Sequence, residues 1–305
     1  MEIRLLNVND LHQVSNLYFE CFHDQIKSSF FNWKYFQNPN GSSYLAGIYE
    51  GNELIASGAL LPEFLGSKKI LKFTDLMTSP HHRNKGLSKI IVSFLTEIGL
   101  EETGIIYTLC SKTATRSFQK LGWSHFDNII YIFRPSLINF GFKKVKSDFK
   151  VIENEFISSY LNRFKINSQQ SQILKTLEWR IQNPKFNYRL IYNTKDASQF
   201  LIFSERNKNA FILYIHESNS TSQLKNLLRQ FFVVIKNLKI KNSILLSIPR
   251  LTINKTFFFR GYFYNFLDKG KMSSILDLNI ICTGDQKSIV EKIRKEFSPF
   301  FYDDI

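Results

Sequence analysis

The first half of the chain shows a pattern of apolar and polar positions that predicts helices and strands in turn. Apolar residues recur every three or four positions over residues 11–22, which predicts a helix buried along one face. Residues 44–49 and 54–61 alternate as strands do, and a Glu-Gly-Asn-Glu sequence between them predicts a hairpin. We expect Asn9 or Asp10 to cap the helix, because short side chains with an oxygen accept hydrogen bonds from the free amides of a first turn.

Residues 72–98 form the stretch around which the first half is organised. They read as a strand that Pro80 ends by removing an amide donor, a short basic turn, and an amphipathic helix that begins after Gly86. Such a turn can bind phosphate, since unpaired backbone N–H groups and the positive end of the helix dipole meet there. It can also be a plain tight turn with solvated cations. The turn comprises six residues, Arg83, Asn84, Lys85, Gly86, Leu87 and Ser88.

Further strands and a helix complete this first pattern. Residues 65–71 lead as a third strand segment into the central strand, and residues 104–110 predict another strand. Residues 113–121 predict a helix that stops at Gly122, and residues 128–133 predict a last strand.

The pattern then begins again, which indicates a second, diverged copy of the same unit. The motif Trp33-Lys34, Asn38-Pro39 and Tyr44 is echoed by Trp179-Arg180, Asn183-Pro184 and Tyr188. Strands are expected at residues 189–193, 200–205, 210–215 and 243–248, and helices at residues 224–238 and before Gly261. We therefore predict a domain of residues 1–137, a linker of residues 138–150 and a domain of residues 151–305.

The second copy lacks the basic turn. Residues 216–222 stand between its strand and its helix, and they include no glycine, lysine or arginine. We therefore expect no pyrophosphate to bind there, and we expect the second copy to act as a scaffold or as a wall of the acceptor site.

Two blocks of the first half resemble the GNAT superfamily of N-acetyltransferases. Arg83-x-x-Gly86-x-Ser88 is similar to the acyl-CoA signature, commonly written Arg/Gln-x-x-Gly-x-Gly/Ala. The second block is similar to Asn-x-x-Ala-x-x-x-Tyr-x-Lys-x-Gly-Phe and matches it at Ala114, Lys120, Gly122 and Trp123. The resemblance covers residues 3–134. It implies an α/β (α+β) fold of tandem GNAT-like domains, each with a mixed, mostly antiparallel sheet flanked by helices.

The resemblance also implies a site for acetyl-CoA. The pantetheine would lie along Leu76, Met77 and Thr78, and the pyrophosphate would lie on the amides of Arg83, Asn84, Lys85, Gly86, Leu87 and Ser88. Ser111 stands where the family often has an Asn that binds the pantetheine. Phe118 stands where the family often has a Tyr that acts as general acid, and a phenylalanine has no proton to donate.

The residues of the acceptor side are less well marked. The family's strand often carries a carboxylate base, and Asp75 is the one carboxylate on this strand. Asp75 can equally face away from the site as a structural hydrogen-bonding residue, because Thr74 occupies the position two before Leu76. The resemblance places Trp33, Asn38 and Tyr44 near the acceptor, although these residues can also be core and turn residues.

Composition limits the remaining classes of protein. The chain has 305 residues, 44% hydrophobic residues and 30 Phe, which is ample for packed cores. We expect no membrane span, no signal peptide and no metal site. Three cysteines that lie far apart, Cys21, Cys110 and Cys282, argue against a disulfide framework, so the cytoplasm is the expected compartment.

Charge is distributed unevenly along the chain. Residues 1–150 carry 17 Lys and Arg against 13 Asp and Glu, a net charge of +4, whereas residues 151–305 carry 23 against 13, or +10. Such a basic half can bind a polyanion or can reflect an AT-rich genome. No basic-aromatic motif of a nucleic-acid module is present, so nucleic acid is not the expected partner.

The function that we expect is an acetyl-CoA-dependent N-acetyltransferase. The string around Asp75, Pro80 and Gly86 resembles, more loosely, two-domain bacterial GNAT proteins of surface polysaccharide biosynthesis. That likeness suggests a small amine acceptor such as a nucleotide-linked amino sugar. One alternative is a non-catalytic acyl-CoA-binding or scaffold protein. Another is a Fem-type aminoacyl-tRNA-dependent peptidyltransferase, against which the intact turn counts. The sequence does not indicate the oligomeric state.

Overall fold

The computed structural model describes residues 1–65, 68–128, 130–135, 148–163, 168–216, 221–247, 263–264 and 278–284. The chain divides into two compact units. The first unit comprises Met1–Asn128 with Asp277–Glu296, and the second comprises Ile129–Leu276 with Phe297–Ile305.

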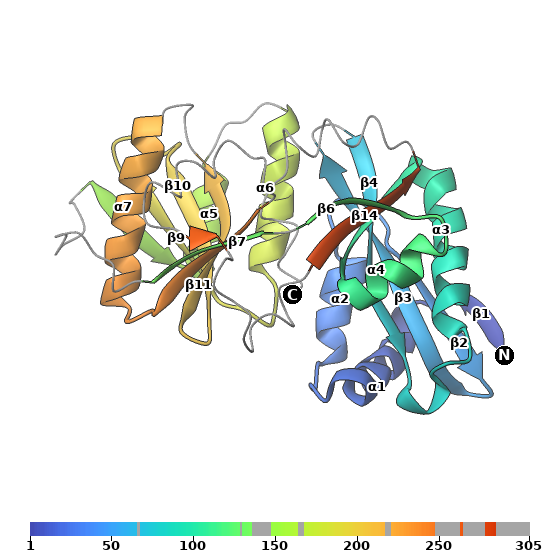
Figure 1. Cartoon of the computed structure of the whole chain (residues 1–305). Coiled ribbons are helices and arrows are strands. Elements are labelled where there is room, and N and C mark those ends of the chain that lie inside the picture. The colour runs from blue at the N-terminus through green and yellow to red at the C-terminus, as the bar shows by residue number, and fades with distance from the viewer. Residues whose placement is uncertain are drawn as a thin grey trace. The chain divides into compact units, whose positions relative to one another are not determined.

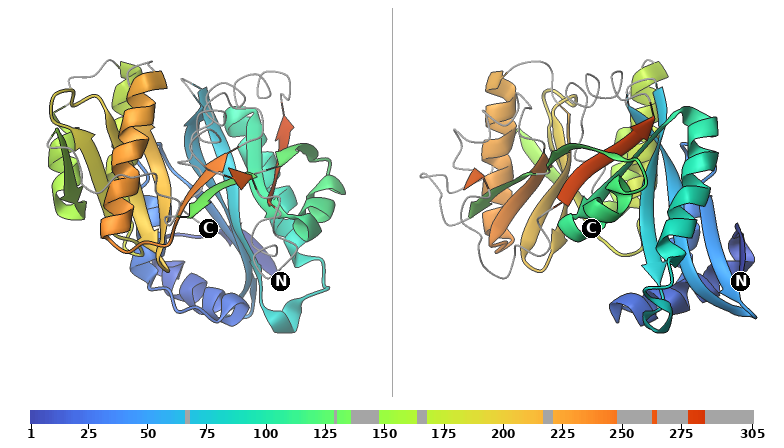
Figure 2. Two further views of the ribbon diagram at one scale, coloured as in Figure 1. Left: turned by 60° about the vertical axis from the view of Figure 1, so that its left-hand side comes forward. Right: turned by 45° about the vertical axis from the view of Figure 1, so that its right-hand side comes forward.

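The first unit is a seven-stranded mixed sheet in the order β1-β2-β3-β4-β5-β14-β6. Its α1 and α2 lie on one face of the sheet and α3 lies on the other (Figures 1 and 2). The strands are β1 (Glu2–Leu5), β2 (Tyr44–Glu50), β3 (Glu53–Leu65), β4 (Lys68–Thr78), β5 (Ile105–Ser111), β6 (Ser124–Asn128) and β14 (Leu278–Gly284). The helices are η1 (Val8–Asp10), α1 (Leu11–Phe22), α2 (Ser28–Phe36), η2 (Pro80–His82), α3 (Leu87–Thr103) and α4 (Lys112–Gln119).

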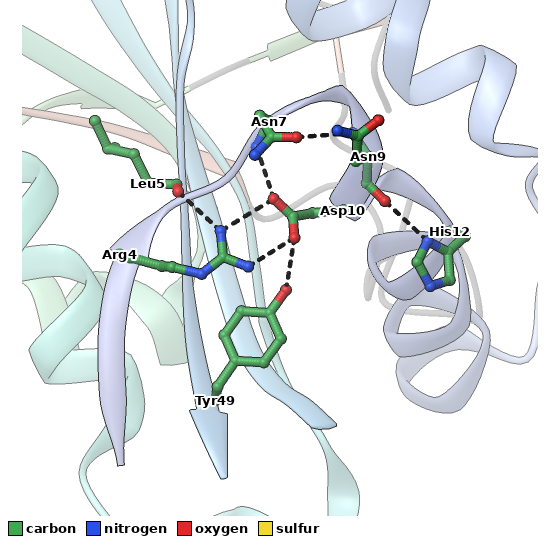
Figure 3. Close-up of polar contacts among 7 residues, drawn as sticks. All are labelled: Arg4, Leu5, Asn7, Asn9, Asp10, His12 and Tyr49. Atoms are coloured by element: carbon green, nitrogen blue, oxygen red, sulfur yellow. Dashed lines mark hydrogen bonds and ion pairs between the residues drawn. The ribbon is translucent and has the colours of Figure 1, made fainter. Parts of the chain in front are cut away.

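A polar cluster ties β1 to β2 and to the start of α1 (Figure 3). Asp10 stands at the N-cap position of α1, but its side chain, against our expectation, makes no capping hydrogen bond there. Instead, Asn7 caps η1, and the Asp10 carboxylate accepts a hydrogen bond from the Asn7 amide at 2.8 Å. Asp10 also accepts from Arg4 Nη2 at 2.7 Å and from the Tyr49 hydroxyl at 3.1 Å. The Arg4 guanidinium and these other donors lower the pKa of Asp10 to about 2.

The central strand is β4, which is longer than the sequence pattern indicates. The predicted segment at residues 65–71 and the central strand belong to one element, since β4 runs from Lys68 to Thr78. It pairs with β3 in antiparallel orientation along most of its length. It pairs with β5 in parallel orientation only over Leu71–Phe73, so the two strands separate after Phe73.

The second unit repeats this architecture with a sheet in the order β8-β9-β10-β11-β12-β7-β13. Its apolar cores lie on both faces, with α7 against one face and α5 and α6 against the other. The strands are β8 (Phe149–Glu153), β9 (Tyr188–Asn193), β10 (Phe200–Arg206), β11 (Asn209–His216), β12 (Asn242–Ser247), β7 (Ile130–Pro135) and β13 (Phe263–Tyr264). The helices are α5 (Asn154–Leu161), α6 (Ser168–Ile181) and α7 (Thr221–Asn237). The helix expected before Gly261 lies outside the described residues.

The two halves of the chain exchange one strand each. The first sheet contains β14 between β5 and β6, and the second contains β7 between β12 and β13. In Figures 1 and 2, the red β14 accordingly lies among the blue and green elements of the first unit. The single strand expected at residues 128–133 is therefore divided between β6 and β7, which belong to different sheets. The boundaries at residues 137 and 151 stay a prediction, and most of the expected linker lies outside the described residues.

The repeated motif has the same structural role in both halves. Trp33 on α2 and Trp179 on α6 are both buried. The Asn38 side chain accepts a hydrogen bond from the amide two residues later, that of Asn40, at 3.0 Å. Asn183 does the same with the amide of Lys185 at 2.9 Å. The two halves are thus copies of one unit, and the fold is a tandem of two mixed sheets flanked by helices.

Candidate functional site

A cavity of about 610 Å³ lies where β4 ends and α3 begins. Most of the residues predicted to bind acyl-CoA meet there, and Lys85 alone of that set is not part of the lining. The residues that line it are Cys21, Phe22, Leu76, Met77, Thr78, His82, Arg83, Asn84, Gly86, Leu87, Ser88, Ser111, Ala114, Ser117 and Phe118.

The cavity exists because β4 and β5 diverge. Their ladder ends with the pair formed by Phe73 and Thr108. Beyond this pair, the backbone groups of Leu76, Met77 and Thr78 that point toward β5 have no ladder partner on that strand. Unpaired backbone donors and acceptors need partners, which an extended amide-containing chain can supply.

The turn before α3 has the conformation of an anion-binding site. Gly86 stands at the N-cap of α3 with φ of 77°, a left-handed conformation that favours glycine. No atom lies within 4 Å of the position where a Cβ of residue 86 would stand. The amides of Leu87 and Ser88 begin the helix and have no acceptor within it. The Ser88 hydroxyl lies 3.2 Å from Thr78 Oγ1, so the turn is linked to the end of β4.

On the α4 side of the cavity, an apolar side chain stands at the position where similar proteins often have a general acid. Phe118 is buried, and its ring packs edge-on against Trp123 at a centroid distance of 4.9 Å and against Phe73 at 5.4 Å. Ser111 caps α4 by accepting a hydrogen bond from the amide of Ala114 at 3.3 Å. The side chain of Phe118 thus contributes packing and no proton.

The sequence of this unit matches the model of the acetyltransferase (GNAT) family over residues 8–123. These residues belong to the GNAT family. The match includes α1 to α4 and both strands whose residues line the cavity, β4 and β5. The first unit is therefore a GNAT acetyltransferase domain.

Solved structures show the same fold over nearly the whole chain. A tandem GNAT protein from the clavulanic acid biosynthesis pathway has a TM-score of 0.57 at 10% identity, covering 93% of this chain and 98% of that one. A GCN5-related N-acetyltransferase from Sphaerobacter thermophilus has a TM-score of 0.54 at 11% identity, covering 93% and 95%. A conserved protein of unknown function from Enterococcus faecalis V583, described as a probable N-acyltransferase, has a TM-score of 0.61 at 9% identity, covering 97% and 75%. The sequence has no match among curated proteins.

The GNAT domain places Asp75 beside the cavity and not in its lining. The Asp75 carboxylate lies 2.8 Å from Lys34 Nζ and accepts a hydrogen bond from the Tyr35 hydroxyl. Both partners belong to α2, so the Asp75 side chain points to the face of the sheet opposite α3. The next three residues of the strand line the cavity.

The other residues expected at the acceptor side lie away from the cavity. Trp33 is buried, and the Asn38 Nδ2 group donates to the carbonyl oxygen of Pro62 at 3.1 Å. The Tyr44 side chain lies near Glu102, and its pKa is raised mainly by burial. These placements support core and turn roles, and the acceptor role of Trp33, Asn38 and Tyr44 stays a prediction.

Two residues of α1 reach the cavity without having been expected there. The Cys21 thiol donates to the carbonyl oxygen of Thr78 at 3.3 Å, and burial raises its pKa. Phe22 is 53% exposed and packs its ring on Tyr18 at 4.7 Å. In the sequence, the one sign that α1 contributes to the cavity is the position of Cys21 on the apolar face of the helix. That position does not distinguish a residue of the core from a residue of the cavity lining.

Two other kinds of site are not found in the described part of the chain. No group of three or more His, Cys, Asp or Glu side chains there could hold a metal ion. None of the described helices is long and apolar enough to span a membrane.

Proposed function

We propose that the chain is an acetyl-CoA-dependent N-acetyltransferase that binds the cofactor in the first unit. The observation that carries the proposal is the meeting of two features at one cavity: the separated ends of β4 and β5, and the left-handed Gly86 at the start of α3. The first feature suits a pantetheine amide chain, and the second suits a pyrophosphate.

The reaction that follows is transfer of the acetyl group to an amine. The amine nitrogen forms a bond to the carbonyl carbon, the carbon–sulfur bond breaks, and the amine loses a proton to a base. The leaving CoA thiolate takes its proton from solvent, since Phe118 offers none. The base that we propose is Asp75.

The proposed acceptor is a small amine, and a nucleotide-linked amino sugar suits the charge of the chain. The phosphates of such an acceptor would be attracted by a protein with a net charge of +14. The attraction weakens as salt screens it, so the KM for this acceptor should rise with ionic strength.

Calorimetric titration with acetyl-CoA tests the cofactor site. We expect wild type to bind and Gly86→Glu to lose at least tenfold in affinity, because the new carboxylate stands where the pyrophosphate should lie. Gly104→Glu is the matched control, since Gly104 ends the same helix with φ of 68° and an equally open Cβ position. Its affinity should stay within twofold of wild type. Failure of wild type to bind acetyl-CoA would contradict the proposal.

A non-catalytic acyl-CoA-binding protein is the second candidate, and the buried Phe118 favours it. Release of CoA distinguishes the acetyltransferase from the binding protein, because a binding protein holds acetyl-CoA and transfers the acetyl group to no amine. A Fem-type peptidyltransferase would instead bind aminoacyl-tRNA and would not depend on Gly86.

A further inference from the structure

One carboxylate on β4 is held by two buried side chains of α2. Lys34 and Tyr35 are 2% and 1% exposed, and both contact Oδ2 of Asp75. A buried ammonium without a counterion costs several kcal/mol, so the contact between Lys34 and Asp75 is strongly favoured once the core has packed. The carboxylate therefore has a fixed position and a fixed orientation.

The backbone at Asp75 has an unusual conformation that gives the side chain this direction. Its φ is 53°, in the left-handed region. Ser57 pairs with Met77 and Ala59 with Thr74, so β4 contains one extra residue at this point, a β-bulge. Because of the bulge, Phe73 and Leu76 both pack under α3 although they stand three residues apart. Asp75 is turned to the α2 side while the strand after it still lines the cavity.

The second copy provides an internal comparison. Ile202 pairs with Tyr214 and Phe203 with Ile212, so β11 has a bulge at the same distance from its end as β4. The extra residue there is Leu213, which is buried in an apolar core and has no left-handed φ. A bulge at this place thus forms without a carboxylate. Asp75 occurs in the copy that has the cavity and the glycine turn.

The two partners of Asp75 leave one of its oxygens available. Both contacts go to Oδ2, and no hydrogen bond to Oδ1 is found within the described part of the chain. The side chain of Asp75 is 16% exposed, so solvent or a ligand can reach it. A base that is oriented through one oxygen and open at the other is arranged for proton transfer.

We propose that Lys34 and Tyr35 are positioning residues that orient Asp75 so that Oδ1 takes the proton of the acceptor amine. The inference rests on the proposed function. The proton leaves the amine nitrogen, directly or through one water, as the carbon–nitrogen bond forms and the carbon–sulfur bond breaks. Lys34 keeps its own proton and acts through Asp75.

The test compares turnover with cofactor binding in Lys34→Met, Lys34→Arg, Tyr35→Phe and Asp75→Asn. The release of free CoA is measured with UDP-glucosamine as the acceptor. If the protein does not acetylate that amine, the release of CoA by hydrolysis, with water as the acceptor, is measured instead. We expect kcat to fall about 100-fold in Asp75→Asn and at least tenfold in Lys34→Met. The Kd for acetyl-CoA should stay within twofold in both. Lys34→Arg should recover part of the loss, and Tyr35→Phe should lower kcat several-fold.

Arg180→Met is the matched control, because Arg180 is the counterpart of Lys34 on α6 and is 1% exposed. It should lose stability as Lys34→Met does and keep the kcat of wild type. If Lys34→Met does not fold, the test rests on the kcat of Lys34→Arg and Tyr35→Phe.

The outcomes separate this inference from the proposed function. Wild type that fails to bind acetyl-CoA contradicts both. Wild type that binds acetyl-CoA but releases no CoA to either acceptor overturns the inference and favours a binding protein. Folded Lys34 and Tyr35 variants with the kcat of wild type overturn the inference alone, and leave Asp75 as the counterion of a buried lysine.

Discussion

Asp10 and Asp75 are both carboxylates beside a cation, and their surroundings give them different roles. Asp10 accepts hydrogen bonds through both oxygens, from Arg4, Asn7 and the Tyr49 hydroxyl, which leaves it suited to holding structure. Asp75 is held through one oxygen only and remains open at the other. The number of carboxylate oxygens that accept hydrogen bonds therefore separates the structural role of Asp10 from the role that we propose for Asp75 better than burial does.

Asp10 should make stability depend on pH. Its pKa of about 2 in the folded protein lies below the unfolded value near 4, so its contribution is present above pH 4 and is lost as the pH falls toward 2. We expect Asp10→Asn to lower the free energy of unfolding by about 2 kcal/mol at pH 7 and by about half as much at pH 3. Urea denaturation at both pH values measures this, with the exposed Glu53→Gln as control. An equal loss at the two pH values would contradict the assignment.

At the scale of elements, α3 connects the sheet to the cavity. Gly99 lets the helix approach the sheet closely, since a Cβ there would stand 2.7 Å from Ile106 Cδ1 and 2.8 Å from Leu60 Cδ1. The same helix presents Gly86 and its free amides to the cavity at its other end. Close packing at one end of α3 thus fixes the position of the proposed anion site at the other end.

Gly99→Val should cost about 1–3 kcal/mol of stability, the usual range for overpacking a filled core. Ser93→Val is its control, because it introduces the same β-branched residue at an exposed position of α3. Thermal or urea denaturation of both variants gives the comparison. Equal stability of the two would show that the sheet repacks around the added methyl groups.

Much of the fold could be predicted from the sequence because the signals are local. The apolar spacing of α1 and α3 and the residues of the glycine turn define these elements within a few residues of chain. The exchange of β7 and β14 could not be predicted, since strand alternation is the same whichever sheet a strand joins. The side of the sheet to which Asp75 points could not be predicted either, because one extra residue in β4 reverses the side to which every later side chain points.

At the scale of the molecule, the exchanged strands should join the two units into one cooperative transition. β14 in the first sheet and β7 in the second each pair with a strand on both sides, so removal of either would break two ladders. Trp33 and Trp123 report on the first unit and Trp179 on the second. We expect a variant with only Trp179 and a variant with only Trp33 and Trp123 to give the same urea midpoint by fluorescence. Two separate midpoints would show that the units unfold independently.

The long stretch of chain between β5 and its partner β14 has a consequence for synthesis. A ribosome makes the glycine turn, β4 and β5 early, yet β14, the strand that lies beside β5, leaves the exit tunnel about 170 residues later. Until then, that edge of β5 is an open ladder in a nascent protein and needs protection from wrong pairing. Assembly of the proposed acyl-CoA site in its final sheet thus waits until β14 has been made, and a product cut short before residue 278 would carry the glycine turn without the finished sheet that supports it.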